Sequence, residues 1–71
     1  KMRCLMNFQE KLVYVRAKLN LTQTELAKLL NVSFITINRW ETGKTQPTKK
    51  AIYIFSIFCK ENHIDFEEKH K

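Results

Sequence analysis

The residues best suited to metal chemistry are two cysteines and two histidines: Cys4, Cys59, His63 and His70. They could supply four zinc ligands, and Cys59 and His63 would share one face of a helix because they lie four residues apart. Structural zinc sites usually take their cysteines from close pairs, and these two are far apart in the chain. We therefore expect no metal and no cofactor, with Cys59 in the core and both histidines in solvent.

Catalytic side chains form no recognisable group in this sequence. There is no Gly-rich phosphate loop, no carboxylate pair with an evident purpose on a shared face, and no Ser, His and Asp set with a supporting fold. We expect no enzymatic activity from this chain itself.

The charge balance favours an anionic partner. Thirteen Lys and Arg residues against seven Asp and Glu residues give a net charge of +6, which suits nucleic acid or an acidic membrane surface. The longest apolar run, Ala51–Cys59, is interrupted by Ser56 and is much shorter than the roughly 20 residues of a membrane span. The sequence therefore predicts no transmembrane helix.

Length and composition predict one small helical domain. With 71 residues, 44% of them hydrophobic, and only one Gly and one Pro, residues 1–71 should form a single all-α domain without strands. We place its core at about residues 8–62 and an irregular tail at 63–71. The unpaired cysteines fit a reducing cytoplasm, and the start at Lys1, without a signal peptide, suggests a trimmed or tagged chain.

Apolar periodicity and capping residues predict the first two helices. Apolar residues at spacings of four, three and four define a helix that Asn20 should end in a left-handed conformation: Phe8, Leu12, Val15 and Leu19. The tetrapeptide "TQTE" then forms a capping box between Thr22 and Glu25. The second helix should stop at Asn31, and with about eight residues it needs tertiary packing to be stable.

A third short helix follows after a turn of three residues. Ser33 is its expected N-cap, Ile37 and Trp40 point inward, and Gly43 ends it.

Thr48 should cap a fourth helix that reaches about Asn62. Its expected core face is Ile52, Phe55 and Cys59. Three further apolar residues then form a second stripe: Ile54, Ile57 and Phe58. Either the tail residues Ile64 and Phe66 or a second copy of the chain could cover this stripe.

Two short helices joined by a three-residue turn, over about residues 22–43 of a small basic domain, are typical of a helix-turn-helix motif. The stretch "LTQTELAKLLNVSFITINRWETGKTQP" resembles the phage-repressor family of such domains, the Cro and lambda-repressor-like or XRE group, within about residues 8–60. The residues in family register are Gln23, Leu26, Ala27, Leu30, Val32, Ile37, Trp40, Glu41, Gly43 and Lys44. Asn31 departs from the family, which most often has Gly there.

The resemblance implies a bundle of four or five helices that binds double-stranded DNA as a transcriptional regulator, most simply a repressor, with helix 34–42 in the major groove. Family habit also favours a homodimer on an inverted repeat, with Ile54, Ile57 and Phe58 at the contact. Two alternatives are a protein-interaction module, in which Phe34 and Ile35 would be the anchor, and the DNA-targeting module of a larger enzyme.

Residues that the resemblance places against bases lie on the third helix: Phe34, Ile35, Thr36, Asn38 and Arg39. The Arg39 guanidinium suits guanine O6 and N7, Asn38 suits adenine or a phosphate, and Ile35 can pack on a thymine methyl group. The Phe34 ring could do the same or fold back over the second helix.

Residues that the resemblance places along phosphates are Gln23, Lys44, Thr45, Lys49 and Lys50. Gln23 begins the second helix, where backbone amides also favour an anion, although it could be an ordinary first helical residue. Lys49 and Lys50 lie in the first turn of the fourth helix, where the positive end of the helix dipole disfavours cations. Contact with a phosphate would explain two lysines there better than solubility alone. Arg16 and Glu41 match an ion pair that sets the angle of the third helix in many relatives.

Overall fold

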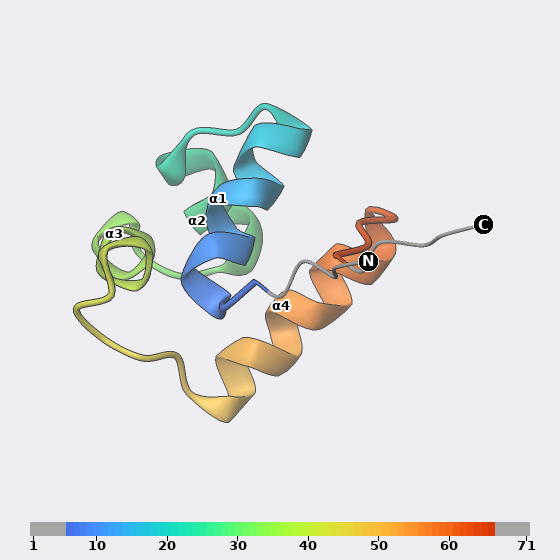
Figure 1. Cartoon of the computed structure of the whole chain (residues 1–71). Coiled ribbons are helices and arrows are strands. Elements are labelled where there is room, and N and C mark those ends of the chain that lie inside the picture. The colour runs from blue at the N-terminus through green and yellow to red at the C-terminus, as the bar shows by residue number, and fades with distance from the viewer. Residues whose placement is uncertain (1–5, 67–71) are drawn as a thin grey trace.

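The computed structural model describes residues 6–66 and contains four helices in this part of the chain. They are α1 (Phe8–Leu19), α2 (Gln23–Leu30), α3 (Phe34–Thr42) and α4 (Lys49–Glu61). Helices α1, α2 and α3 form one group, and α4 runs along its side (Figure 1). Helix α3 packs on both α1 and α2, and α4 contacts α2. The all-α prediction is confirmed.

Each helix begins with a side chain that caps its first turn. The predicted caps of α2, α3 and α4 are confirmed, since each accepts a hydrogen bond from a backbone amide three residues later: Thr22, Ser33 and Thr48. Helix α1 has a capping box between Asn7 and Glu10 that we did not predict, although "NFQE" carries the same signature as "TQTE".

All four helices end with the same backbone arrangement. A residue with positive φ follows each last turn, and the next amide donates to a carbonyl five residues earlier, the pattern of a Schellman motif. The residues with positive φ are Asn20 (57°), Asn31 (60°), Gly43 (79°) and His63 (57°). The predicted terminators of α1, α2 and α3 are therefore confirmed, and the one at His63 was not anticipated. After three of these residues an apolar side chain turns inward and packs with the core: Leu21, Val32 and Ile64.

The core draws on all four helices. Its buried residues are Leu12, Val15, Leu26, Ala27, Leu30, Ile37, Trp40, Phe55, Cys59 and Ile64. The Phe8 ring packs edge-on against Trp40 and Phe55, with ring centroids 5.3 and 5.1 Å apart. Because α2 and α3 are short, this shared interior supplies the packing that holds them.

The predicted core face of α4 is wrong at one position. Phe55 and Cys59 are buried, but Ile52 is 45% exposed. The core-facing stripe runs from the partly buried Ala51 through the buried Phe55 and Cys59 at intervals of four residues, and Ile52, although only about 60° from Phe55 around the helix, stays at the exposed edge of that stripe. The small side chain of Ala51 thus occupies the place that we assigned to Ile52.

The tail beyond α4 packs on one side of that helix and leaves the other side open. Ile64 is buried, and the Phe66 ring lies 5.5 Å from that of Tyr14 in α1, centroid to centroid. In contrast, Ile54 is 39% exposed and Ile57 37% exposed. The described part of the tail therefore leaves Ile54 and Ile57 uncovered, whereas Phe58, the third residue of the second stripe, is partly buried against the core.

The zinc ligands considered above are not brought together in the described residues. Burial raises the pKa of the Cys59 thiol to about 11, so Cys59 is a neutral core residue at pH 7. His63 is exposed, and Cys4 and His70 lie outside the described residues. Within residues 6–66, no group of three or more His, Cys, Asp or Glu side chains is placed to hold a metal ion.

The described helices, α1 to α4, are too short or too polar to cross a membrane.

Thr22→Ala should lower the free energy of unfolding by about 0.5–2 kcal/mol, because it removes the hydroxyl that accepts from the Glu25 amide at 3.1 Å. Thr24→Ala is the matched control, since Thr24 is exposed on the same helix and should change stability by less than about 0.5 kcal/mol. Urea unfolding followed by circular dichroism measures both variants. Equal losses in the two would show that the cap does not stabilise α2.

Candidate nucleic-acid interface

Helix α3 has one face in the core and one face in solvent. Ile37 and Trp40 are buried, whereas the outer face carries the five residues predicted to contact bases: Phe34, Ile35, Thr36, Asn38 and Arg39. Four of these are exposed, and Thr36 is partly buried with its hydroxyl 2.9 Å from that of Ser33. The outer face therefore combines apolar surface with an amide and a guanidinium.

The two apolar residues of the outer face are both about half exposed. Its side chain is 47% exposed and does not join the core or the residues packed around it. Ile35 beside it is 58% exposed. The Phe34 ring is therefore about half covered and lies outside the core.

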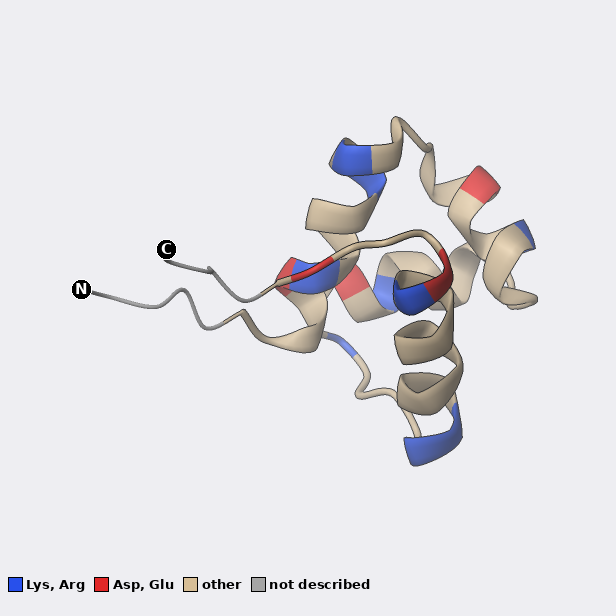
Figure 2. Cartoon of the chain, turned by 90° about the vertical axis from the view of Figure 1, so that its right-hand side faces the viewer, with Lys and Arg blue, Asp and Glu red and all other residues tan. Residues whose placement is uncertain are grey.

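Basic residues lie in the segment that follows α3. Lys44 and Thr45 are exposed in the loop, and Lys49 and Lys50 are exposed in the first turn of α4. Figure 2 shows these basic positions in the loop and at the start of α4, at the opposite end of that helix from residues 63–66. The first turn of α4 has no acidic residue to balance the positive end of the helix dipole. This end of α4 is thus suited to an anion.

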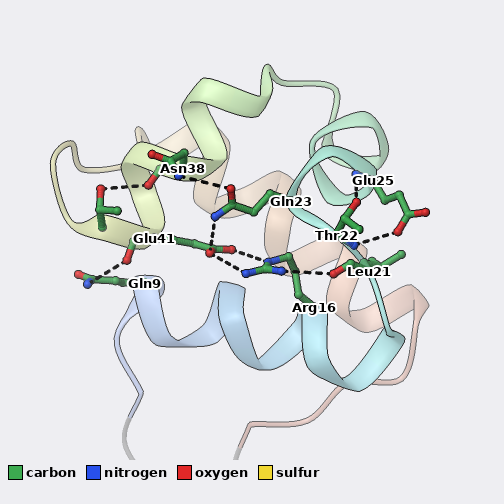
Figure 3. Close-up of polar contacts among 9 residues, drawn as sticks. Gln9, Arg16, Leu21, Thr22, Gln23, Glu25, Asn38 and Glu41 are labelled. Carbon is green, nitrogen blue, oxygen red and sulfur yellow. Dashed lines mark hydrogen bonds and ion pairs between the residues drawn. The ribbon is translucent and has the colours of Figure 1, made fainter.

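The Glu41 side chain connects three helices beneath the outer face (Figure 3). Arg16 of α1 donates from Nε to Glu41 Oε2 at 2.7 Å and from Nη2 to Glu41 Oε1 at 2.9 Å. Gln23 of α2 donates from Nε2 to Glu41 Oε1 at 2.8 Å. The ion pair expected between Arg16 and Glu41 is thus present, and the Glu41 side chain is only 7% exposed.

The same contacts control the charge of Glu41. Burial, the largest single effect, acts to raise the pKa of its carboxyl group. The hydrogen bonds from Arg16 and Gln23 and the charge of Arg16 outweigh burial and hold that pKa below its ordinary value. Conversely, the hydrogen bond to Glu41 raises the pKa of Arg16. Glu41 is therefore a carboxylate at neutral pH.

The Gln23 side chain makes two hydrogen bonds within the protein, which neither the phosphate contact nor an ordinary first helical residue predicted. Besides donating to Glu41, it accepts a hydrogen bond at Oε1 from Asn38 Nδ2 at 3.4 Å. These contacts join residues 18 and 15 positions apart in the chain, so no local pattern could reveal them. Gln23 is nevertheless at the start of α2, as predicted.

Gln9 is a contributor to this region that the sequence analysis missed. Its Nε2 donates to the backbone oxygen of Glu41 at 3.3 Å, near the end of α3. A Cβ atom added to Gly43 would lie 3.1 Å from Gln9 Oε1, so the glycine makes room for this contact as well as adopting positive φ. Gln9 and Glu41 are 32 residues apart, and again no local signal exists.

Comparison with known proteins gives matches over most of the chain. A family model described as helix-turn-helix matches residues 12–65. The chain is 43% identical over 53 residues to the HTH-type transcriptional activator BcrR of Enterococcus faecalis, covering 75% of this chain and 26% of that protein. It is 34% identical over 64 residues to the HTH-type transcriptional regulator DicA of Escherichia coli (strain K12), covering 87% of this chain and 47% of that protein.

The chain thus spans about a quarter of one relative and about half of the other. No solved structure matches it.

Glu41→Gln should remove a contribution to stability that depends on pH. The pKa of Glu41 in the folded state lies below its ordinary value of 4.5, so its contribution is complete above pH 4.5 and is lost as the pH falls through the lower folded-state pKa. At pH 7 we expect the variant to be less stable by about 1–3 kcal/mol, because Arg16 loses its charged partner.

Urea unfolding of both proteins at several pH values measures this difference, which should shrink below pH 4.5. Glu61→Gln, at an exposed position of α4, is the control for loss of one negative charge. If the difference in the free energy of unfolding between wild type and Glu41→Gln stays constant down to acid pH, the pKa of Glu41 is not lowered in the folded state.

Proposed function

The chain belongs to the helix-turn-helix family, and on that premise we propose that it binds double-stranded DNA as a transcriptional regulator, with α3 in the major groove. The observation that carries the proposal is the outer face of α3. This face keeps Phe34 and Ile35 about half exposed, next to Asn38 and Arg39, although the opposite face is fully packed. A major groove offers such a face both thymine methyl groups and hydrogen-bonding base edges.

Four residues on the outer face of α3 have a specific proposed contact. Arg39 donates its forked N–H groups to guanine O6 and N7, and Ile35 and Phe34 pack on thymine methyl groups. Thr36, whose hydroxyl already pairs with Ser33, contacts a base or a phosphate at the start of the helix.

Phosphate contacts on both sides of α3 would hold it in the groove. Lys44, Thr45, Lys49 and Lys50 follow α3, and their exposure and the lack of acidic neighbours in the first turn of α4 support this role. On the other side, Gln23 uses one Nε2 hydrogen on Glu41 and has a second one for a phosphate. The free amides at the start of α2 can bind the same group.

We propose that the regulator acts in the cytoplasm and represses transcription by occupying its operator. One relative is named an activator and the other a regulator, so a reporter gene downstream of the operator is the assay that determines the direction.

We further propose that the chain binds an inverted repeat as a homodimer. Ile54 and Ile57 remain exposed on α4, and with the partly buried Phe58 they give a second copy an apolar surface. A symmetric pair would place two copies of α3 in successive major grooves.

Selection from a random pool of duplex DNA tests the proposed function. We expect one motif to be enriched, consisting of two inverted half-sites about one helical turn apart. Failure to enrich any sequence, together with capture of a protein partner that Phe34→Ala and Ile35→Ala abolish, would favour an interaction module instead.

Arg39→Ala and Lys49→Ala should weaken binding in different ways. Loss of Arg39 should cost about 1–3 kcal/mol on the selected site and relax preference at one base pair. Loss of Lys49 should weaken all sequences alike and reduce the slope of log affinity against log salt by about one. Lys60→Ala is the charge-matched control, since Lys60 lies at the other end of α4. Equal losses on selected and random DNA for Arg39→Ala would remove it from base reading.

Ile57→Lys should abolish dimer formation on DNA. We expect the wild type to sediment as a dimer on a two-half-site duplex and the variant to bind each half-site independently. Ser56→Lys adds the same charge at the neighbouring exposed position and should leave the dimer intact. Monomeric binding by the wild type, with equal affinity for one and two half-sites, would refute the dimer.

A further inference from the structure

A line of three hydrogen-bonded side chains runs from Glu41, whose side chain is 7% exposed, to the exposed Asn38 (Figure 3). We infer that Glu41 fixes the orientation of the Gln23 carboxamide and, through it, that of Asn38, so that Asn38 presents Oδ1 to DNA and reads a base with an amino group in the major groove. This inference rests on the proposed function and specifies which bases one residue of α3 accepts.

The orientation begins at Glu41 because a carboxylate can only accept hydrogen bonds. Glu41 is ionised at neutral pH, and Arg16 holds both of its oxygens, at 2.7 and 2.9 Å. Gln23 approaches Oε1 at 2.8 Å, so it must turn its NH₂ group toward Glu41. The opposite orientation would place two acceptor oxygens against each other beside a side chain that is only 7% exposed.

The orientation of Gln23 then determines that of Asn38. With Nε2 on Glu41, the Gln23 Oε1 atom lies on the side of Asn38 and again can only accept. Asn38 meets it with Nδ2 at 3.4 Å, a long hydrogen bond. Figure 3 shows the carbonyl oxygen of Asn38 turned away from Gln23. Gln23 therefore donates to Glu41, Asn38 donates to Gln23, and the acceptor oxygen of Asn38 is left facing solvent.

The outward group of Asn38 selects among base pairs. Its Oδ1 accepts from adenine N6 or cytosine N4, the two amino groups in the major groove, and one Nδ2 hydrogen remains for adenine N7. Guanine and thymine present acceptors at the corresponding positions, as a phosphate does, so they can use only the remaining Nδ2 hydrogen and leave Oδ1 without a donor. Asn38 thus prefers adenine or cytosine over the phosphate contact that its sequence position also allowed.

Affinity measured for the selected site and for its single-base variants tests the inference. Wild type should prefer one base pair by about fivefold or more, and Asn38→Ala should identify that pair by losing the preference there. Removing the amino group of the adenine or cytosine in that pair should cost the wild type the same preference, because Oδ1 then has no donor. Gln23→Ala should reduce the preference at the same pair to less than about twofold, while preferences at other pairs persist. A role of Gln23 in phosphate binding alone would weaken all sites equally and would not change this ratio.

Arg16→Gln provides the control for stability. It breaks the ion pair but leaves the Glu41 carboxylate facing Gln23, so it should lower the melting temperature without relaxing the preference at the Asn38 base pair. Binding is measured below the melting temperature of each variant.

Two results would overturn the inference while leaving DNA binding in place. One is the absence of any base pair at which Asn38→Ala removes a wild-type preference, or a wild-type preference at that pair that survives replacement of its adenine by purine, or of its cytosine by 2-pyrimidinone, which lack the amino group. The other is an unchanged preference in Gln23→Ala. If the wild type enriches no sequence from the random pool, the proposed function fails and the inference fails with it.

Discussion

A carboxylate that is shielded from water needs hydrogen-bond donors from the protein, and Glu41 can obtain them only if α1, α2 and α3 take one arrangement. Apolar packing brings these helices together, but it is non-directional and tolerates a range of angles. The contacts from Arg16 and Gln23 to Glu41 are short and directional, at 2.7 to 2.9 Å. Desolvation offsets much of their attraction, so their main effect is on the placement of α3 relative to its neighbours.

Most of the fold was predictable because its boundaries are encoded locally. The caps at Thr22, Ser33 and Thr48 act within one helical turn, and the left-handed conformations of Asn20 and Asn31 depend on the short side chain at that position. His63 was missed because we expected the fourth helix to end at about Asn62, one residue earlier, although histidine is among the residues enriched in that conformation.

The sequence predictions fail where several tertiary arrangements are compatible with the same pattern of apolar residues. Helix α4 is apolar around most of its circumference, so periodicity alone could not decide between Ala51 and Ile52 for the core. The position of the candidate interface on α3 followed from the spacing of Ile37 and Trp40 and from the resemblance to phage repressors. The contacts of Gln9 and Gln23 did not follow, because they depend on how distant segments meet.

The two faces of α3 also bear on how such a protein can change over generations. The inner face supports the fold through Ile37 and Trp40, while Phe34, Ile35 and Arg39 have no partners in the core. Substitutions on the outer face therefore carry little risk of unfolding, and a lineage can explore new target sequences without passing through unstable intermediates. Asn38 is the exception, since its amide is tied to Gln23. A change there alters the outer face of α3 and its hydrogen bond to α2 together, so we expect it to be accepted less freely than a change at Ile35.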